Sequence, residues 1–319
     1  MRRVALREYV PLAALVLAWL AIGATVGPAD AVRLLAALTF VRAARSLTVP
    51  GSIPPLRKRL RSGEHQAQAT RVVLLVEAIA LPFAVLALGA IVALLWAADE
   101  ARVAIMALLF APALPVRFLI PLAARRAFGK VYRPTIALVG LTLMGAGALL
   151  GADAYVFALL FAARDWLALG ISYLLAPQLR PRRGVAGEAR IEELQWREVA
   201  DHSYAKGRKL AAYRFGKTFL HALLGPFGTI AARTGRGLRM DKKFEPFVPR
   251  STAALSLVAL ASATASIAIV LLVPEPALLV VAASLLRVSS ASANVLIWGA
   301  LSGNLNAVAP DDDDDEDDL

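Results

Sequence analysis

The chain has 319 residues, of which 58% are hydrophobic and only 18% are charged, and its mean hydropathy is +0.62. A soluble domain is about half apolar and about a quarter charged, so this composition excludes one, and it excludes a disordered chain for the same reason. The net charge of +11 hides an acidic run at 311–318; before it, 35 basic residues stand against 16 acidic ones, a net charge of +19. These numbers predict an all-α polytopic membrane protein.

The chain contains no cysteine, which excludes a disulfide framework and a cysteine-ligated zinc site. Its three histidines, His65, His202 and His221, are too few and too scattered for a histidine-rich di-iron cluster. We therefore expect no metal and no cofactor.

Apolar stretches divide the chain into candidate membrane spans of about 20 residues each. Seven stretches reach that length or nearly so: 9–27, 71–97, 103–123, 134–151, 154–175, 251–273 and 276–301. An eighth stretch, 30–47, carries Arg33, Arg42 and Arg45, and its hydropathy alone is typical of a helix at the membrane interface.

The distribution of basic residues favours counting 30–47 as a span. With eight spans, 30 of the 35 basic residues fall on one side of the membrane and only Arg102 on the other. We therefore predict about eight transmembrane helices with both termini cytoplasmic, in a bacterial inner membrane, with Arg42 and Arg45 at the inner interface. The first span also resembles a signal peptide, and its removal would leave seven spans and an external N-terminus.

Short connections at 27–30, 98–102, 151–153 and 274–276 join the spans into four hairpins. The second helices of the first three hairpins share the strings ALTF (37–40), ALLF (107–110) and ALLF (158–161), each followed by an arginine. Repeated hairpins are common in transporter folds. The alternative is chance similarity between apolar helices.

We divide the chain into residues 1–175, which hold predicted transmembrane helices 1–6, and residues 251–301, which hold helices 7–8. Two polar segments make up the rest. Segment 176–250 holds 16 basic and seven acidic residues in an amphipathic pattern. This favours contact with anionic lipid head groups, with a solvated loop as the alternative; no nucleic-acid-binding motif accompanies the charge. Residues 302–319 are typical of a disordered acidic tail, which either solubilises the protein, screens the basic segment or binds a basic partner.

Catalytic motifs are missing from the sequence. The string GKT at 216–218 lacks the first glycine of a phosphate-binding loop, because Ala211 stands there. Glu198, Asp201 and His202 are loose candidates for a lipid-modifying site, but their helical spacing is more typical of a solvated face. We therefore do not predict an enzyme.

Ionisable residues inside the spans are the strongest functional signal, since a charge in the bilayer costs about 3 kcal/mol or more unless it is paired or hydrated. We predict that Arg117, Arg164 and Arg287 bind the substrate, and that Asp165 and Glu77 act as ion-pair partners or coupling acids. The excess of arginine suits an anionic ligand such as a phosphate or pyrophosphate head group. The alternative is that the two acids neutralise arginines and lock helices together.

Prolines interrupt two of the spans, Pro82 in the third and Pro112 and Pro115 in the fourth. Broken helices often line transport paths. Proline is also frequent in membrane helices in general, so this pattern supports transport only weakly.

Residues 27–75 (GPADAVRLL…RVVLL) and 117–140 (RFLIPLAARRAFGKVYRPTIALVG) carry a resemblance to a known family. Over roughly residues 10–180 the layout resembles oligosaccharide and polysaccharide flippases of the multidrug/oligosaccharidyl-lipid/polysaccharide superfamily. The resemblance implies a lipid-linked saccharide exporter with a cationic cavity, onto which Arg117 and Arg164 map. That family has twelve or more helices and no counterpart of segment 176–250, so the resemblance implies a half-size member that dimerises or an accessory protein.

These observations predict a flippase-like membrane transporter or export component for an anionic lipid or lipid-linked saccharide. Its partners would be anionic membrane lipids and a second copy or another membrane protein. The alternative is a non-transporting membrane scaffold or assembly protein that acts through its basic cytoplasmic segment and acidic tail.

Overall fold

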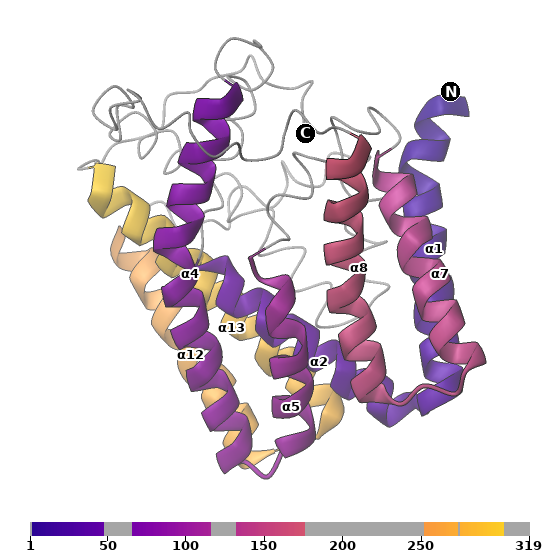
Figure 1. Ribbon diagram of the computed structural model, residues 1–319. Coiled ribbons are helices and arrows are strands. Elements are labelled where there is room, and N and C mark those ends of the chain that lie inside the picture. The colour runs from indigo at the N-terminus through magenta and orange to yellow at the C-terminus, as the bar shows by residue number, and fades with distance from the viewer. Residues whose placement is uncertain (1, 48–65, 116–131, 176–251, 274, 303–319) are drawn as a thin grey trace.

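The computed structural model describes residues 2–47, 66–115, 132–175, 252–273 and 275–302, and every regular element in them is helical (Figure 1). Each of the eight predicted spans contains a helix, which confirms the all-α class. The helices are α1 (Arg2–Val26), α2 (Pro28–Ser46), α4 (Gln66–Ala97), α5 (Ala101–Phe110), the 3-10 helix η1 (Ala111–Ala113), α7 (Tyr132–Leu149), α8 (Ala154–Leu175), α12 (Thr252–Leu272) and α13 (Pro276–Ser302).

The helices form four antiparallel hairpins, α1–α2, α4–α5, α7–α8 and α12–α13, whose turns lie at the same end of the bundle (Figure 1). These are the pairs that the short connections predict. The tightest turn is the single residue Gly27, whose φ of 82° lies in the left-handed region that glycine adopts without steric cost. Pro28 follows at the first position of α2, where its missing N–H has no helical partner to lose.

Three of the described helices are long and apolar enough to cross a membrane: Ala154–Leu175, Thr252–Leu272 and Pro276–Ile297. Shorter apolar helices cover Val10–Val26, Leu81–Ala97, Ala101–Ala113 and Pro134–Leu149. Exposed leucines along the outer faces, among them Leu257, Leu260 and Leu174, suit a lipid environment rather than water. The chain is therefore a helical membrane protein.

Helix α2 occupies the centre of the bundle and contacts α1, α4, α5, α8 and α13. Its residues 34–41 are all buried in succession, which means that this part of the helix is covered on every side. A helix lying at the membrane interface would keep one face exposed, so the hydropathy of 30–47 alone is misleading. The charges that lower its hydropathy, Asp30, Arg33, Arg42 and Arg45, flank the buried run.

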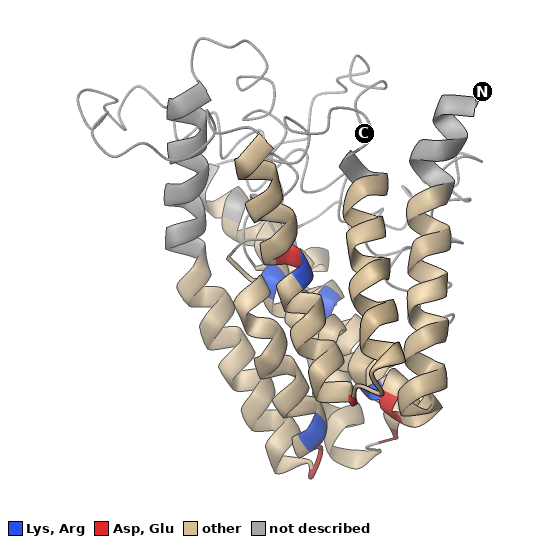
Figure 2. Cartoon of the chain, turned by 45° about the vertical axis from the view of Figure 1, so that its right-hand side comes forward, with Lys and Arg blue, Asp and Glu red and all other residues tan. Residues whose placement is uncertain are grey.

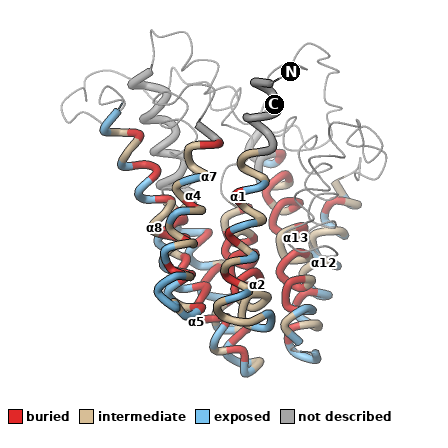
Figure 3. Tube along the Cα trace, turned by 90° about the vertical axis from the view of Figure 1, so that its right-hand side faces the viewer, coloured by how far each residue is buried: buried red, intermediate tan, exposed pale blue. Residues whose placement is uncertain are grey.

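The second helices of the hairpins form the inner part of the bundle, because α2 contacts α5, α8 and α13, and α5 contacts α8. The phenylalanines of the three repeated strings, Phe40, Phe110 and Phe161, are all buried there. The rings of Phe110 and Phe161 lie 5.7 Å apart between centroids, and Trp19 of α1 lies 5.8 Å from Phe161. Figure 3 shows that buried positions concentrate between the helices and exposed positions along their outer faces.

Candidate functional site

Charged residues lie at two levels of the described bundle, one at the hairpin turns and one near mid-height (Figure 2). The second group comes from three of the inner helices. Away from the hairpin turns, the charged residues of these helices are Arg42 and Arg45 of α2, Arg164 and Asp165 of α8, and Arg287 of α13. These described residues comprise four arginines and one aspartate.

A small cavity lies between α2, α8 and the junction of α5 with η1. It encloses about 10 Å³ of water-accessible space, which is room for roughly one water molecule. Leu38, Val41, Phe110, Ala113, Leu114 and Phe161 form its apolar walls, and Arg45, Arg164 and Asp165 are its charged residues. The cavity is therefore a largely apolar space whose lining includes two arginines and one aspartate.

Arg164 is held by two neighbours on its own helix. Its Nε and Nη2 atoms both donate to Oδ1 of Asp165, at 2.9 and 2.6 Å, and its guanidinium carbon lies 5.5 Å from the centroid of the Phe161 ring. The side chain of Arg164 is 19% exposed and that of Asp165 only 4%. Because the two residues are adjacent in α8, this ion pair orients Arg164 without joining two helices.

The wall opposite α8 contains a break in helical structure. Helix α5 ends at Phe110 and continues as η1, in which Pro112 has no N–H to donate to the helical ladder. The Pro112 carbonyl accepts a hydrogen bond of 2.9 Å from Nε1 of Trp166 on α8. This hydrogen bond therefore joins η1 to α8 beside the cavity.

The structure brings together part of the predicted site. Arg164 and Asp165 line one cavity, whereas Arg287 is not among its lining residues. Arg117 lies outside the described residues, and Glu77 belongs to α4 but its side chain is outside the described part. These assignments therefore stay predictions.

Arg45 is the residue that the sequence analysis missed. The sequence predicts Arg45 at the inner membrane interface, with no part in binding, whereas the structure places it in the lining of the cavity together with Arg164. The available signal is its spacing of three residues from Arg42, because residues three apart in a helix lie on the same side of it. Leu47 caps the end of α2, where the last carbonyls of a helix have no partner within it. Nδ2 of Asn294 donates to the Leu47 carbonyl at 2.7 Å, which fixes α13 against α2.

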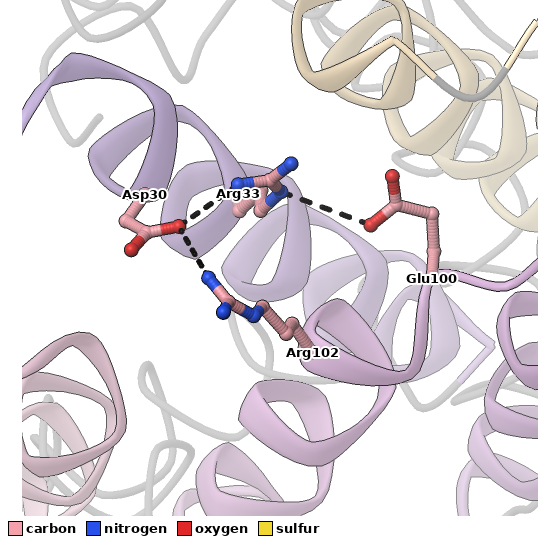
Figure 4. A network of polar contacts seen from close by, with 4 residues as sticks. All are labelled: Asp30, Arg33, Glu100 and Arg102. Atoms are coloured by element: carbon pink, nitrogen blue, oxygen red, sulfur yellow. Dashed lines mark hydrogen bonds and ion pairs between the residues drawn. The ribbon is translucent and has the colours of Figure 1, made fainter.

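A second charged cluster links the turns of the first two hairpins (Figure 4). Oδ1 of Asp30 lies 3.0 Å from Nη1 of Arg33 and 3.7 Å from Nη1 of Arg102, and Nε of Arg33 lies 3.8 Å from Oε2 of Glu100. Burial raises the pKa of Glu100, although the nearby guanidinium groups of Arg33 and Arg102 oppose this shift. The positive and negative charges balance here, so this cluster is suited to holding the hairpins together rather than to binding an ion.

The cavity, in contrast, places guanidinium groups of two helices beside one apolar space. Arginine in such a setting binds oxyanions through paired N–H donors, in competition with the carboxylate that already accepts from it. Comparison with protein-family models, with curated proteins and with solved structures finds no match for this chain.

Proposed function

We propose that this protein is a flippase-like membrane transporter, or an export component, for an anionic lipid or lipid-linked saccharide. The observation that carries the proposal is the cavity that Arg45 and Arg164 share inside the bundle. In this proposal the anionic head group binds between the two guanidinium groups, and the resting charge of Arg164 is compensated by Asp165.

The energetic argument concerns the location of the charges. A guanidinium group inside a membrane protein is costly, so it is retained where it pairs or meets a ligand. Asp165 pairs with Arg164, and Arg45 lines the same cavity. A phosphate or pyrophosphate group accepts several N–H bonds at once, which suits a space lined by guanidinium groups from two helices.

The space at the site implies that the protein changes shape during its cycle. Room for about one water molecule is too small for a phosphate group, so binding requires α8 to move away from the α5–η1 wall. The helix break at Pro112 supplies a place where that wall can bend, since the helical hydrogen-bond ladder is already interrupted there.

The wider assignment is part of the same proposal. All eight helices cross a bacterial inner membrane with both termini cytoplasmic, and Arg117 and Arg287 provide further contacts to the anion along the path. Asp165 and Glu77 serve as partners of the arginines or couple transport to protons. A chain of this size acts as a homo-oligomer or with a partner membrane protein.

Transport of a fluorescent anionic phospholipid in proteoliposomes tests the proposal, with R45Q and R164Q compared against R102Q. Arg102 is the matched control, because its side chain is 63% exposed at the hairpin turns. We expect R45Q and R164Q to lose about tenfold or more of the rate, the value of one charge-assisted hydrogen bond, and R102Q to keep it. Wild-type rates in both cavity variants, at equal protein level and thermal stability, would overturn the proposal.

The scaffold alternative predicts the opposite pattern in cells. Removing 311–319 or trimming 186–245 would then abolish function, while the cavity variants would be harmless.

A further inference from the structure

Trp166 of α8 and Pro112 of η1 are exposed residues that directly adjoin, in sequence, residues lining the cavity. On α8, Asp165 lines the cavity, and the next residue, Trp166, is 49% exposed. On the facing wall, Ala113 lines the cavity, and the preceding residue, Pro112, is exposed. On each wall, therefore, a residue that lines the cavity is followed or preceded in sequence by an exposed one.

We call the line of contact between α5–η1 and α8 the seam, and a hydrogen bond joins its two sides. Nε1 of Trp166 donates to the carbonyl of Pro112 at 2.9 Å and joins α8 to η1. Behind the seam lies α2, whose residues 34–41 are all buried. Apolar residues are exposed on both helices near the seam, Leu108 on α5 and Leu167 on α8.

We propose that the seam between α5–η1 and α8 is a lateral portal, latched by the Trp166–Pro112 hydrogen bond, through which an anionic lipid places its head group at Arg45 and Arg164. The inference rests on the proposed function and adds the route and the latch. The acyl chains of such a lipid remain outside, against the apolar residues of the seam. A lipid is the occupant because the seam faces the exposed apolar surface, whereas a soluble anion would need a path lined by water.

The absence of cysteine allows a direct test by site-specific photo-crosslinking. A benzophenone is attached to L108C at the seam and, in a separate protein, to L138C on the outer face of α7. The two leucines are matched, with exposures of 48% and 49%. Both proteins are placed in phosphatidylcholine nanodiscs that contain a minor fraction of phosphatidic acid.

We expect L108C to crosslink phosphatidic acid several-fold above its share of the lipid, and L138C to crosslink both lipids in proportion. The enrichment at L108C should vanish when R164Q or R45Q is added, and thermal unfolding identifies a variant that has lost its fold. Excess inorganic pyrophosphate in the buffer should leave the enrichment unchanged.

The latch is tested by W166F, which keeps an aromatic ring but removes the N–H donor, with W96F as control. Trp96 is exposed near the end of α4, at the hairpin turns. Exchange of crosslinkable phosphatidic acid at the seam should accelerate by about fivefold in W166F, the factor that one hydrogen bond of ordinary strength contributes. W96F should exchange at the wild-type rate.

Three outcomes separate this inference from the proposed function. Equal crosslinking at L108C and L138C, with lipid transport still dependent on Arg45 and Arg164, overturns the portal and leaves the function standing. Loss of the enrichment on adding pyrophosphate identifies a soluble anion as the ligand and also overturns the portal. No enrichment together with no dependence of transport on the arginines overturns both.

Discussion

Gly140 of α7 lies directly against Arg164 of α8: a methyl group at Gly140 would come within 2.9 Å of Cδ of Arg164. That distance is too short for two carbon atoms, so the missing side chain at Gly140 is what allows Arg164 to occupy its position beside the cavity. The orientation of the arginine therefore depends on a neighbouring hairpin helix as well as on Asp165.

Replacing Gly140 should consequently impair the site without removing a charge. G140A forces the Arg164 side chain to shift, and G140V forces a larger displacement, which breaks the short hydrogen bonds to Asp165. We expect transport of the anionic lipid to fall several-fold in G140A and further in G140V. G145A is the control, since a methyl group there meets nothing within 4 Å; wild-type transport in G140V would show that the position of Arg164 is unimportant.

A second α7 glycine, Gly147, should govern stability rather than transport. A methyl group at Gly147 would lie 2.7 Å from Cδ1 of Leu160 and 3.1 Å from Cε1 of Phe157. The leucine methyl can rotate, but Phe157 is fully buried and cannot easily move. Overpacking of this kind costs about 1–3 kcal/mol.

Thermal or denaturant unfolding in detergent measures this effect by comparing G147A with G145A. The control should be neutral or more stable by up to about 1 kcal/mol, because alanine favours a helix over glycine. If both variants unfold alike, α7 and α8 are packed less closely than the structure describes.

The pairing of Arg164 with Asp165 predicts a non-additive response to mutation. D165N alone leaves a largely buried guanidinium group without its carboxylate, which should cost about 3 kcal/mol of stability. In the double variant R164Q/D165N neither charge remains, and most of that loss should be recovered. A double-mutant cycle by unfolding in detergent yields the coupling energy, and a coupling near zero would contradict the ion pair.

The buried carboxyl of Glu100 should make stability depend on pH. Its pKa in the folded protein is raised above the ordinary value of 4.5 by burial, so the folded state holds the proton more tightly than the unfolded state. The contribution of this group to stability is therefore largest in acid and decreases as the pH rises from about 4.5 through the raised pKa.

Melting temperatures of wild type and E100Q between mildly acidic and neutral pH test this dependence. The two proteins differ only at position 100, so the difference between the two curves isolates Glu100. Relative to E100Q, the wild type should lose stability as the pH rises. A difference that is constant with pH, or of the opposite sign, would contradict the raised pKa.

Local sequence properties were sufficient to predict the helices. Length and hydropathy act within one segment, and so the apolar stretches appear as helices and the short connections as hairpin turns. The predicted span 103–123 differs in one respect, because α5 ends at Phe110 and η1 follows at Pro112. The proline itself was visible in the sequence, but its carbonyl partner, Trp166, lies 54 residues away.

What the sequence determined by itself is the class of the protein, an all-helical membrane protein whose helices pair through short turns, since hydrophobicity and turn chemistry depend on adjacent residues. Only the tertiary structure decided that α2, despite its four charged residues, lies at the centre, and that Arg45 rather than Arg287 shares a cavity with Arg164. The physical reason is that burial and convergence depend on which helices pack together, and the contacts between α2 and α8 join residues more than a hundred positions apart.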